Sequence, residues 1–273
     1  MSLLHFEQDE LQSWADYSGD YNPIHFDETV ARAIGQKGVV MHGMLAMLPI
    51  KTMHSDLDWT DDGWLEWKAM LRDAMPLLSD YRLESRIVKP MQEVRFKLSS
   101  AEDEQLKISG RCTSIDFDSA PYTTRKRLKL PTNEAKQALQ EFTTRFPSAS
   151  ASWVVIDAMI FSHYICHHAD EVFKEAVTRN MQSEGSDLPE PENVVAMQTH
   201  HNDIFIKELL RESDFNNLDS FEYSYYITDE ILSKDSVYLI VEIPVWINRK
   251  LLQIVKLGLM ARLLVPAKTR GAF

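Results

Sequence analysis

The stretch Tyr17-Ser18-Gly19-Asp20-Tyr21-Asn22-Pro23-Ile24-His25 decides how the rest of the chain is interpreted. Gly19 tolerates backbone angles that other residues avoid, Asn22 favours turns, and Pro23 fixes its own φ and keeps Asn22 out of the helical region. We therefore expect a rigid turn that holds the carboxylate of Asp20 and the imidazole of His25 in set directions. Such a pair is the usual equipment for moving protons to and from a substrate, although surface turns also carry Asp and His without a catalytic purpose.

The full pattern is more specific than this pair. The string continues to Ala31, and a second cluster follows it: Gly38-Val39-Val40-Met41-His42-Gly43-Met44-Leu45. Together these residues resemble the signature of the MaoC-like dehydratases, also called (R)-specific enoyl-CoA hydratases or hydratase 2. That signature is an aromatic residue, one or two residues, Ser-Gly-Asp-x-Asn-Pro-aliphatic-His, five residues, and then Ala or Ser. The family also carries a His-Gly at the start of its central helix, where His42-Gly43 stands here. The strong resemblance covers roughly residues 4–50, and a weaker strand pattern extends it to about residue 116.

The resemblance implies a hot-dog fold, in which an antiparallel sheet wraps a central helix. An apolar helix followed by strand patterns occurs twice, which indicates a diverged duplication. The first copy has a helix over Val39–Met53 and strands over Tyr81–Val88, Val94–Ser99 and Leu106–Asp116; the second has a helix over Trp153–Phe173 and strands over Val194–Ile206, Phe221–Thr228, Val237–Ile247 and Leu251–Val265. We expect an α+β double hot-dog: two antiparallel sheets, each wrapped around a central helix, packed side by side. Residues 1–118 would form the catalytic half, 119–150 a linker, and 151–273 a degenerate second half.

Four segments carry further expectations. Pro49 should bend or end the first central helix. Residues 54–75 are polar, contain three Trp residues, and receive no assigned element. The linker contains a helical stretch near residues 133–136, and the acidic segment Met181–Asn193 is expected to be an exposed loop. The second half lacks the signature, so a purely structural role is expected for it. In the two-domain eukaryotic hydratases of the family the order of the halves is reversed, so details of how the substrate is accommodated do not transfer.

Composition narrows the class of protein. The chain has 273 residues and a net charge of −12, which argues against nucleic acid as a partner. We expect neither a signal peptide nor a membrane-spanning segment, since no apolar run is long enough. Two distant cysteines, Cys112 and Cys166, indicate a reducing compartment without a disulfide framework. These features are typical of a cytoplasmic protein.

The resemblance also implies roles for single residues. Hydration of a trans-2-enoyl thioester needs a water activated for attack at Cβ and a proton delivered to Cα, and Asp20 and His25 would share these transfers, with the formal base left open. The Gly43 amide at the start of a helix would stabilise the charge on the thioester oxygen; the alternative is a glycine needed for close packing. Asn22, His42 and Met44 are the candidate substrate-binding residues. The chemistry calls for no cofactor and no metal.

The carrier of the thioester would be coenzyme A or the phosphopantetheine of an acyl carrier protein. Both bring phosphates, and from Arg82 to Lys129 there are eleven Lys or Arg against seven Asp or Glu. This stretch could steer either carrier, or it could be an ordinary solvated surface. A homo-oligomer is left open, because two hot-dog halves in one chain could replace the homodimer that single hot-dogs form.

Three alternatives stay open. The same fold could serve as an acyl thioesterase, in which water attacks the thioester carbonyl, or as a non-catalytic subunit that binds acyl thioesters. His163 and His167, four residues apart in a helix, could also join His200, His201 or Asp203 in a metal site, although a structural role is favoured. The run Met41, Met44 and Met47 is expected in the core, bordering an adaptable acyl pocket.

Overall fold

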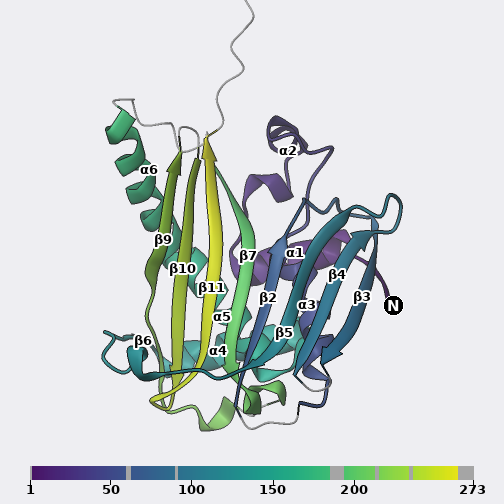
Figure 1. Ribbon diagram of the computed structural model, residues 1–273. Helices are drawn as coiled ribbons and strands as arrows, with labels where there is room; N and C mark the ends of the chain where they lie inside the picture. Colours follow the sequence, from purple (N-terminus) through teal and green to yellow (C-terminus); the bar gives the residue numbers. More distant parts are fainter. Residues whose placement is uncertain are drawn as a thin grey trace, which may run out of the picture.

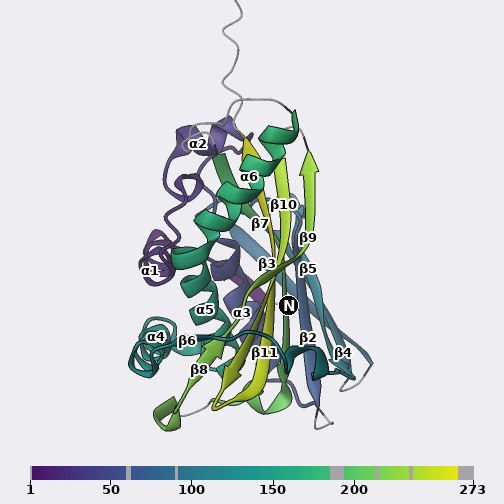
Figure 2. The same ribbon diagram turned by 90° about the vertical axis from the view of Figure 1, so that its left-hand side faces the viewer.

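The computed structural model describes residues 2–59, 63–89, 92–184, 194–212, 215–233 and 236–263. Within these ranges the strands pair antiparallel in one eleven-stranded sheet. Figure 1 looks onto this sheet, and Figure 2, turned by a quarter turn, shows that the helices gather on one of its faces. In the described part of the chain no helix is both long and apolar enough to cross a membrane.

Runs of helices and runs of strands follow one another along the chain. The first part contains β1 (Ser2–His5), α1 (Gln8–Ser18), α2 (Glu28–Ala33), α3 (Gly43–Ser55), β2 (Trp64–Leu71), β3 (Asp80–Lys89), β4 (Glu93–Ser100) and β5 (Leu106–Ile115). It is followed by β6 (Leu128–Leu130) and α4 (Thr132–Arg145). The last part contains α5 (Ser152–Tyr164), a π-helical turn (Ile165–Ala169), α6 (Asp170–Glu184), β7 (Val194–Ile206), β8 (Phe221–Tyr223), β9 (Tyr226–Ser233), β10 (Ser236–Ile247) and β11 (Lys250–Leu263).

The strand order repeats in the two parts. After α3 the strands lie in the order β3-β4-β5-β2, and after α5 they lie in the order β9-β10-β11-β7. In each case the first strand after the central helix pairs with the last strand of its own part. The predicted double hot-dog is therefore confirmed, with one addition. The two expected sheets are continuous, because β2 pairs with β7 from Trp64–Ile206 to Met70–His200.

The two central helices lie in the core. Every residue from 151 to 161 is buried, as expected for a helix that is apolar all round. The indole Nε1 of Trp153 donates to Ser55 Oγ at 2.8 Å, which joins α5 to α3. Both helices thus pack on the same face of the sheet, near the point where β2 and β7 meet (Figure 1).

Several boundaries differ from the prediction. The first central helix begins at Gly43, because Val40 N–H donates to Ile24 O and Met41 N–H donates to Met75 O, outside any helix. It does not end at Pro49 but continues to Ser55, since a proline removes only one helical donor.

The strand assignments also need correction. The unassigned segment 54–75 contains β2, which is a central strand of the sheet. Residues 221–228 form parts of two strands, β8 and β9, instead of one. Of the predicted acidic loop, residues 181–184 belong to α6 and residues 185–193 lie outside the described residues.

The segment predicted as a linker contributes to the core. Ala135, Leu139 and Phe142 of α4 are buried, and the ring of Phe142 lies 5.3 Å from that of Tyr17 on α1. This helix therefore covers the same face of the sheet as α1 and α5 (Figure 2). The division at residues 118 and 150 stays a prediction.

Candidate functional site

The signature turn begins where α1 ends. Gly19 has φ 69°, in the left-handed region, and its N–H donates to Ala15 O at 2.8 Å to close the helix. A Cβ at this position would lie 2.4 Å from Cys166 Sγ. Both the backbone angle and the close approach of the second half therefore require glycine here.

Asn22 fixes the turn from inside. Its backbone N–H donates to Asp20 Oδ1 at 3.3 Å, and its own Oδ1 accepts from Ile24 N–H at 3.4 Å. The side-chain amide donates to the carbonyl of Ala196 on β7. Pro23 then opens a single 3₁₀ turn that ends at His25. The expected rigid turn is thus present, and Asn22 anchors it to the second half of the molecule.

One ring nitrogen of His25 is held by the main chain, and among the described residues no hydrogen bond engages the other. Its Nδ1 donates to Val40 O at 2.7 Å, and only 7% of the residue is exposed. Burial lowers the pKa of His25, and this effect outweighs the opposite influences of the Asp20 carboxylate and the Val40 carbonyl. The neutral imidazole that results can accept a proton at Nε2.

His42 packs against His25 and supports the turn. The two rings lie 3.7 Å apart, and His42 Nε2 donates to the backbone carbonyl of Asp20 at 2.9 Å. Burial, with a further contribution from His25, lowers the pKa of His42 to about 3. His42 is therefore neutral and holds Asp20 through its main chain.

Gly43 is the first residue of α3, so its N–H has no acceptor within the helix and lies at the positive end of the helix dipole. The packing explanation also applies, because a Cβ on Gly43 would lie 2.3 Å from Leu71 Cδ2. The next residue, Met44, is buried, and its sulfur lies 3.8 Å from Gln198 Nε2.

A cavity of about 850 Å³ opens at this point. All six predicted site residues line it: Asp20, Asn22, His25, His42, Gly43 and Met44. Its opposite wall comes from the second half, including Phe161, Cys166 and Phe173 of the helical region and residues 196–199 of β7. The second half therefore forms part of the cavity, and the expectation that its role is purely structural stays a prediction.

In the part of the chain that the structure describes, two groups of side chains have ligand atoms close enough together to surround a metal ion. In the first, one atom each of Asp20, His25 and His42 lie within 4.8 Å of one another, so these three could ligate a cation. The second group is Asp157, His201 and Asp203, and here the Lys51 ammonium already lies 2.9 Å from Asp203 Oδ2. The ammonium group of Lys51 thus occupies the position that a metal ion would take in the second group.

The predicted alternative around His163 and His167 is not supported. His163 Nε2 contacts the hydroxyl of Tyr223 at 2.9 Å, away from His201 and Asp203. His200, the other candidate ligand, contacts the hydroxyl of Tyr238 at 2.9 Å. The structure brings His201 and Asp203 together, but with partners that the sequence did not indicate.

The basic stretch is largely engaged in ion pairs. Lys97 contacts Glu84 at 3.1 Å, Arg95 contacts Glu93 at 2.7 Å, and Arg127 contacts Glu222 at 3.0 Å. Surface pairs of this kind neutralise part of the local excess of positive charge. The basic side chain that does line the cavity is the exposed Arg72, just outside that stretch.

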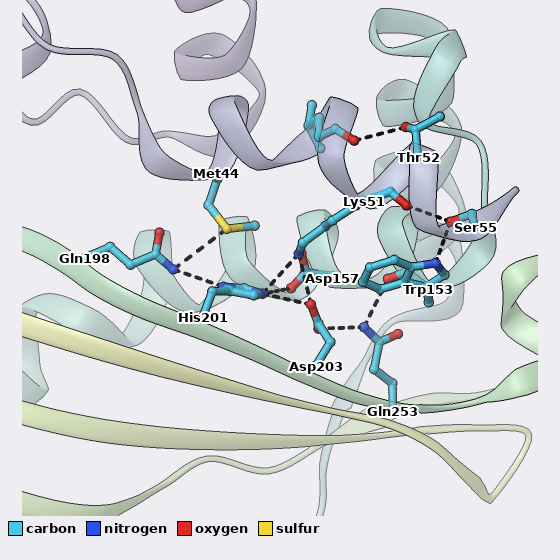
Figure 3. A network of polar contacts seen from close by, with 11 residues as sticks. Met44, Lys51, Thr52, Ser55, Trp153, Asp157, Gln198, His201, Asp203 and Gln253 are labelled. Carbon is cyan, nitrogen blue, oxygen red and sulfur yellow. Dashed lines mark hydrogen bonds and ion pairs between the residues drawn. The ribbon is translucent and has the colours of Figure 1, made fainter. Parts of the chain in front are cut away.

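Gln198 of β7 is one of several polar side chains of the cavity that sequence reasoning missed. Its Nε2 lies 2.9 Å from His201 Nδ1 (Figure 3). The amide thus joins the cavity wall to the buried group of Asp157, His201 and Asp203. No local pattern marks this residue, because the pairing of β7 with β11, in which Gln198 lies opposite Leu259 of the cavity wall, is what brings it to the site.

Comparisons with known proteins bear on the family resemblance and on the fold. Residues 3–48 match the sequence model of the MaoC like domain. No curated protein was found to match the chain. A MaoC domain dehydratase from Chloroflexus aurantiacus J-10-fl superposes with a TM-score of 0.55 at 9% identity, covering 96% of this chain and 93% of that one.

Two further solved structures are similar at lower scores. The dehydratase domain of PpsC from Mycobacterium tuberculosis, in complex with C12:1-CoA, has a TM-score of 0.47 at 10% identity and covers 82% of this chain and 85% of that one. A MaoC-like dehydratase has a TM-score of 0.46 at 11% identity, with 95% of each chain covered. Residues 3–48 are therefore similar to the MaoC-like domain, and the chain shares its fold with the Chloroflexus dehydratase over nearly its whole length.

Proposed function

We propose that the protein catalyses the reversible, (R)-specific hydration of trans-2-enoyl thioesters, or the dehydration of (R)-3-hydroxyacyl thioesters in the reverse direction. The observation that carries the proposal is the pair of Asp20 and His25. His25 has its Nδ1–H bonded to the carbonyl of Val40, and Asp20 lies on the same turn. Both residues line the cavity, and so does Gly43 at the N-terminus of α3.

The addition of water needs both groups. His25 accepts through Nε2 and Asp20 through its carboxylate, so together they can hold one water for attack at Cβ. The hydroxyl of this water adds to Cβ, and the proton that it releases to the Asp20–His25 pair is delivered to Cα. The hydroxyl group and the proton added across the double bond thus come from one water, and no redox step is involved.

The negative charge that builds on the thioester oxygen needs fixed donors. The Gly43 N–H at the start of α3 is in the right place to supply one, because the residue lines the cavity and has no side chain in the way. Asn22 and His42 support the turn, and Met44 borders the acyl chain.

The substrate carrier is proposed from its chemistry. Coenzyme A or an acyl carrier protein would present the thioester, and the exposed Arg72 at the cavity offers a positive charge to their phosphates. A cavity of about 850 Å³ with apolar side chains from both halves suits an acyl chain. We place the protein in the cytoplasm, as its composition predicts.

The test is an assay of the purified protein on a short trans-2-enoyl-CoA, with the enoyl absorbance and the free thiol followed in parallel. Loss of the absorbance without thiol, giving the (R)-3-hydroxyacyl product, is the expected result. Release of thiol would identify a thioesterase, and binding without either change would identify a non-catalytic subunit. Both of these outcomes contradict the proposal.

A further inference from the structure

A cluster of charged side chains is buried where the two halves meet. Lys51 of α3, Asp157 of α5, and His201 and Asp203 of β7 are all fully buried. Lys51 Nζ contacts both carboxylates, at 2.9 Å for Asp203 Oδ2. His201 Nε2 lies 2.9 Å from Asp157 Oδ1 and 3.0 Å from Asp203 Oδ2 (Figure 3).

The charge of this cluster depends on His201. Two carboxylates and one ammonium leave one negative charge in excess, and a buried charge without a partner is costly. A protonated His201 makes the cluster neutral. Burial and the Lys51 ammonium, whose Nζ lies 3.1 Å from His201 Nε2, would lower the pKa of His201, but the nearby Asp157 and Asp203 carboxylates outweigh both and raise it. The charge balance of the cluster therefore favours an imidazolium with a proton on each ring nitrogen.

The second proton of His201 needs an acceptor on the side of the cavity. Nδ1 faces the side-chain amide of Gln198, whose nearer terminal atom is 2.9 Å away and is the nitrogen in Figure 3. That orientation suits a neutral ring, because an amide nitrogen donates and cannot accept. An imidazolium requires the carbonyl oxygen in this place, and a half turn of the amide exchanges the two atoms. The half turn gains a charge-assisted hydrogen bond from His201 Nδ1–H to Gln198 Oε1. It gives up the long contact between Gln198 Nε2 and the sulfur of Met44, which is weaker.

The other end of the same amide lies beside Gly43. Its oxygen is 3.3 Å from the place that a Cβ on Gly43 would occupy, and Gln198 lines the cavity together with Asp20 and His25. With the carbonyl turned to His201, the NH₂ group takes this place beside Gly43.

We propose that Gln198 is the second donor to the thioester oxygen, beside the Gly43 amide, and that His201 turns the Gln198 amide into the donating orientation. Lys51, Asp157 and Asp203 act as positioning residues, because they keep His201 charged. The half of the chain without the signature thus supplies part of the catalytic site. This inference rests on the proposed function, since it assigns a donor to the same reaction.

Two measurements on the full-length protein test it. The first is the steady-state hydration of an enoyl-CoA. The second is the infrared carbonyl band of a bound saturated acyl-CoA labelled with ¹³C at the thioester, which needs no turnover and moves to lower frequency with each donor. Gln198→Ala and Gln198→Glu are compared with Gln253→Ala. Gln253 also bonds to the cluster, at 3.0 Å from Asp203 Oδ1, but it does not line the cavity.

We expect Gln198→Ala to lower kcat by about 10²–10³-fold, the usual effect of removing one oxyanion donor, with little change in KM. Its carbonyl band should move toward the frequency of free acyl-CoA. Gln198→Glu should lose as much, because a carboxylate accepts but cannot donate. His201→Asn should move the band in the same direction, and Gln253→Ala should leave both kcat and the band close to wild type. Gln198→Met and Gln253→Met replace the alanine variants if these do not fold.

Contrary results are equally clear. The role of Gln198 as a donor is overturned if Gln198→Ala keeps the wild-type kcat and the wild-type frequency of the carbonyl band. It is also overturned if Gln198→Glu is fully active. An unmoved band in His201→Asn, with the effect of Gln198→Ala present, overturns the orientation by His201. A wild-type protein that binds the thioester with a lowered band but does not hydrate it contradicts the proposed function and leaves Gln198 supported. A protein that binds no thioester contradicts both.

Discussion

Replacing Lys51 by Met should destabilise the protein strongly, since it takes the ammonium out of the buried cluster while keeping most of the side-chain volume. Lys51 is fully buried, and its Nζ contacts Asp157 and Asp203. Without it the cluster holds two carboxylates and one imidazolium, so one negative charge is left in a core that excludes water. Removing one partner of a buried ion pair lowers the free energy of unfolding by about 3–5 kcal/mol. At about 2–4 °C per kcal/mol for a chain of this size, the melting temperature should fall by about 6–20 °C.

Urea unfolding followed by tryptophan fluorescence measures this loss. Lys68→Met is the matched control, because Lys68 also pairs with a carboxylate, at 2.7 Å from Glu66 Oε1, but its side chain is 42% exposed. An exposed pair contributes about 0–1 kcal/mol, so Lys68→Met should hardly change the midpoint. The double variant Lys51→Met/Asp157→Asn restores neutrality and should be more stable than Lys51→Met alone.

Two outcomes would refute this reasoning. Lys51→Met could lose no more stability than Lys68→Met, which would mean that the buried charges are not coupled. Alternatively, Asp157→Asn could lower the stability of Lys51→Met further, which would mean that net charge is not what makes the single variant unstable.

Three shorter predictions follow. The contribution of His42 to the free energy of unfolding should be constant above pH 6.5 and fall as the pH drops from 6.5 toward 3, because the unfolded chain takes up a proton that His42, with its pKa lowered to about 3, does not take up in the folded state. Denaturant unfolding at several pH values in this range should therefore show a smaller slope of stability against pH in His42→Asn than in the wild type. Gly19→Ala should lower the free energy of unfolding by about 1–2 kcal/mol because of the positive φ, and by more because the new Cβ collides with Cys166 Sγ. Adding Cys166→Ala should remove the collision and so restore part, but not all, of the lost melting temperature. Treatment with a chelator should leave the hydration rate unchanged if Asp20 and His25 act as acid and base, whereas a rate lost on chelation and restored by a metal would assign them as ligands.

The sequence predicted the parts of the fold that depend on local pattern. The signature turn follows from Gly19, Asn22 and Pro23, and the two buried helices follow from runs that are apolar on every face. The strand β2 was missed, although Leu65, Trp67 and Ala69 alternate with more exposed residues as in a half-buried strand. The polar residues and tryptophans of this segment drew attention away from its alternation of buried and more exposed positions, which is the pattern of a strand.

The buried cluster left a weaker signal. Lys51 and Asp157 are lone charges in otherwise apolar helices, and a charge in such a place needs a partner. The sequence indicates that each has a partner but not which one, because the contact joins residues 106 positions apart. No feature of the sequence marks Gln198, since its place at the cavity follows from the register between β7 and β11.

The measurement that tests the central claim most directly is the hydration rate of Asp20→Asn, His25→Ala and the double variant, each confirmed to be folded and to bind a saturated acyl-CoA. Removing a positioned acid or base typically lowers the rate by about 10²–10⁴-fold. Because the two residues act as a unit, the double variant should be little slower than the slower single variant. A wild-type rate in either single variant, with binding intact, would contradict the assignment of Asp20 and His25 as the catalytic pair.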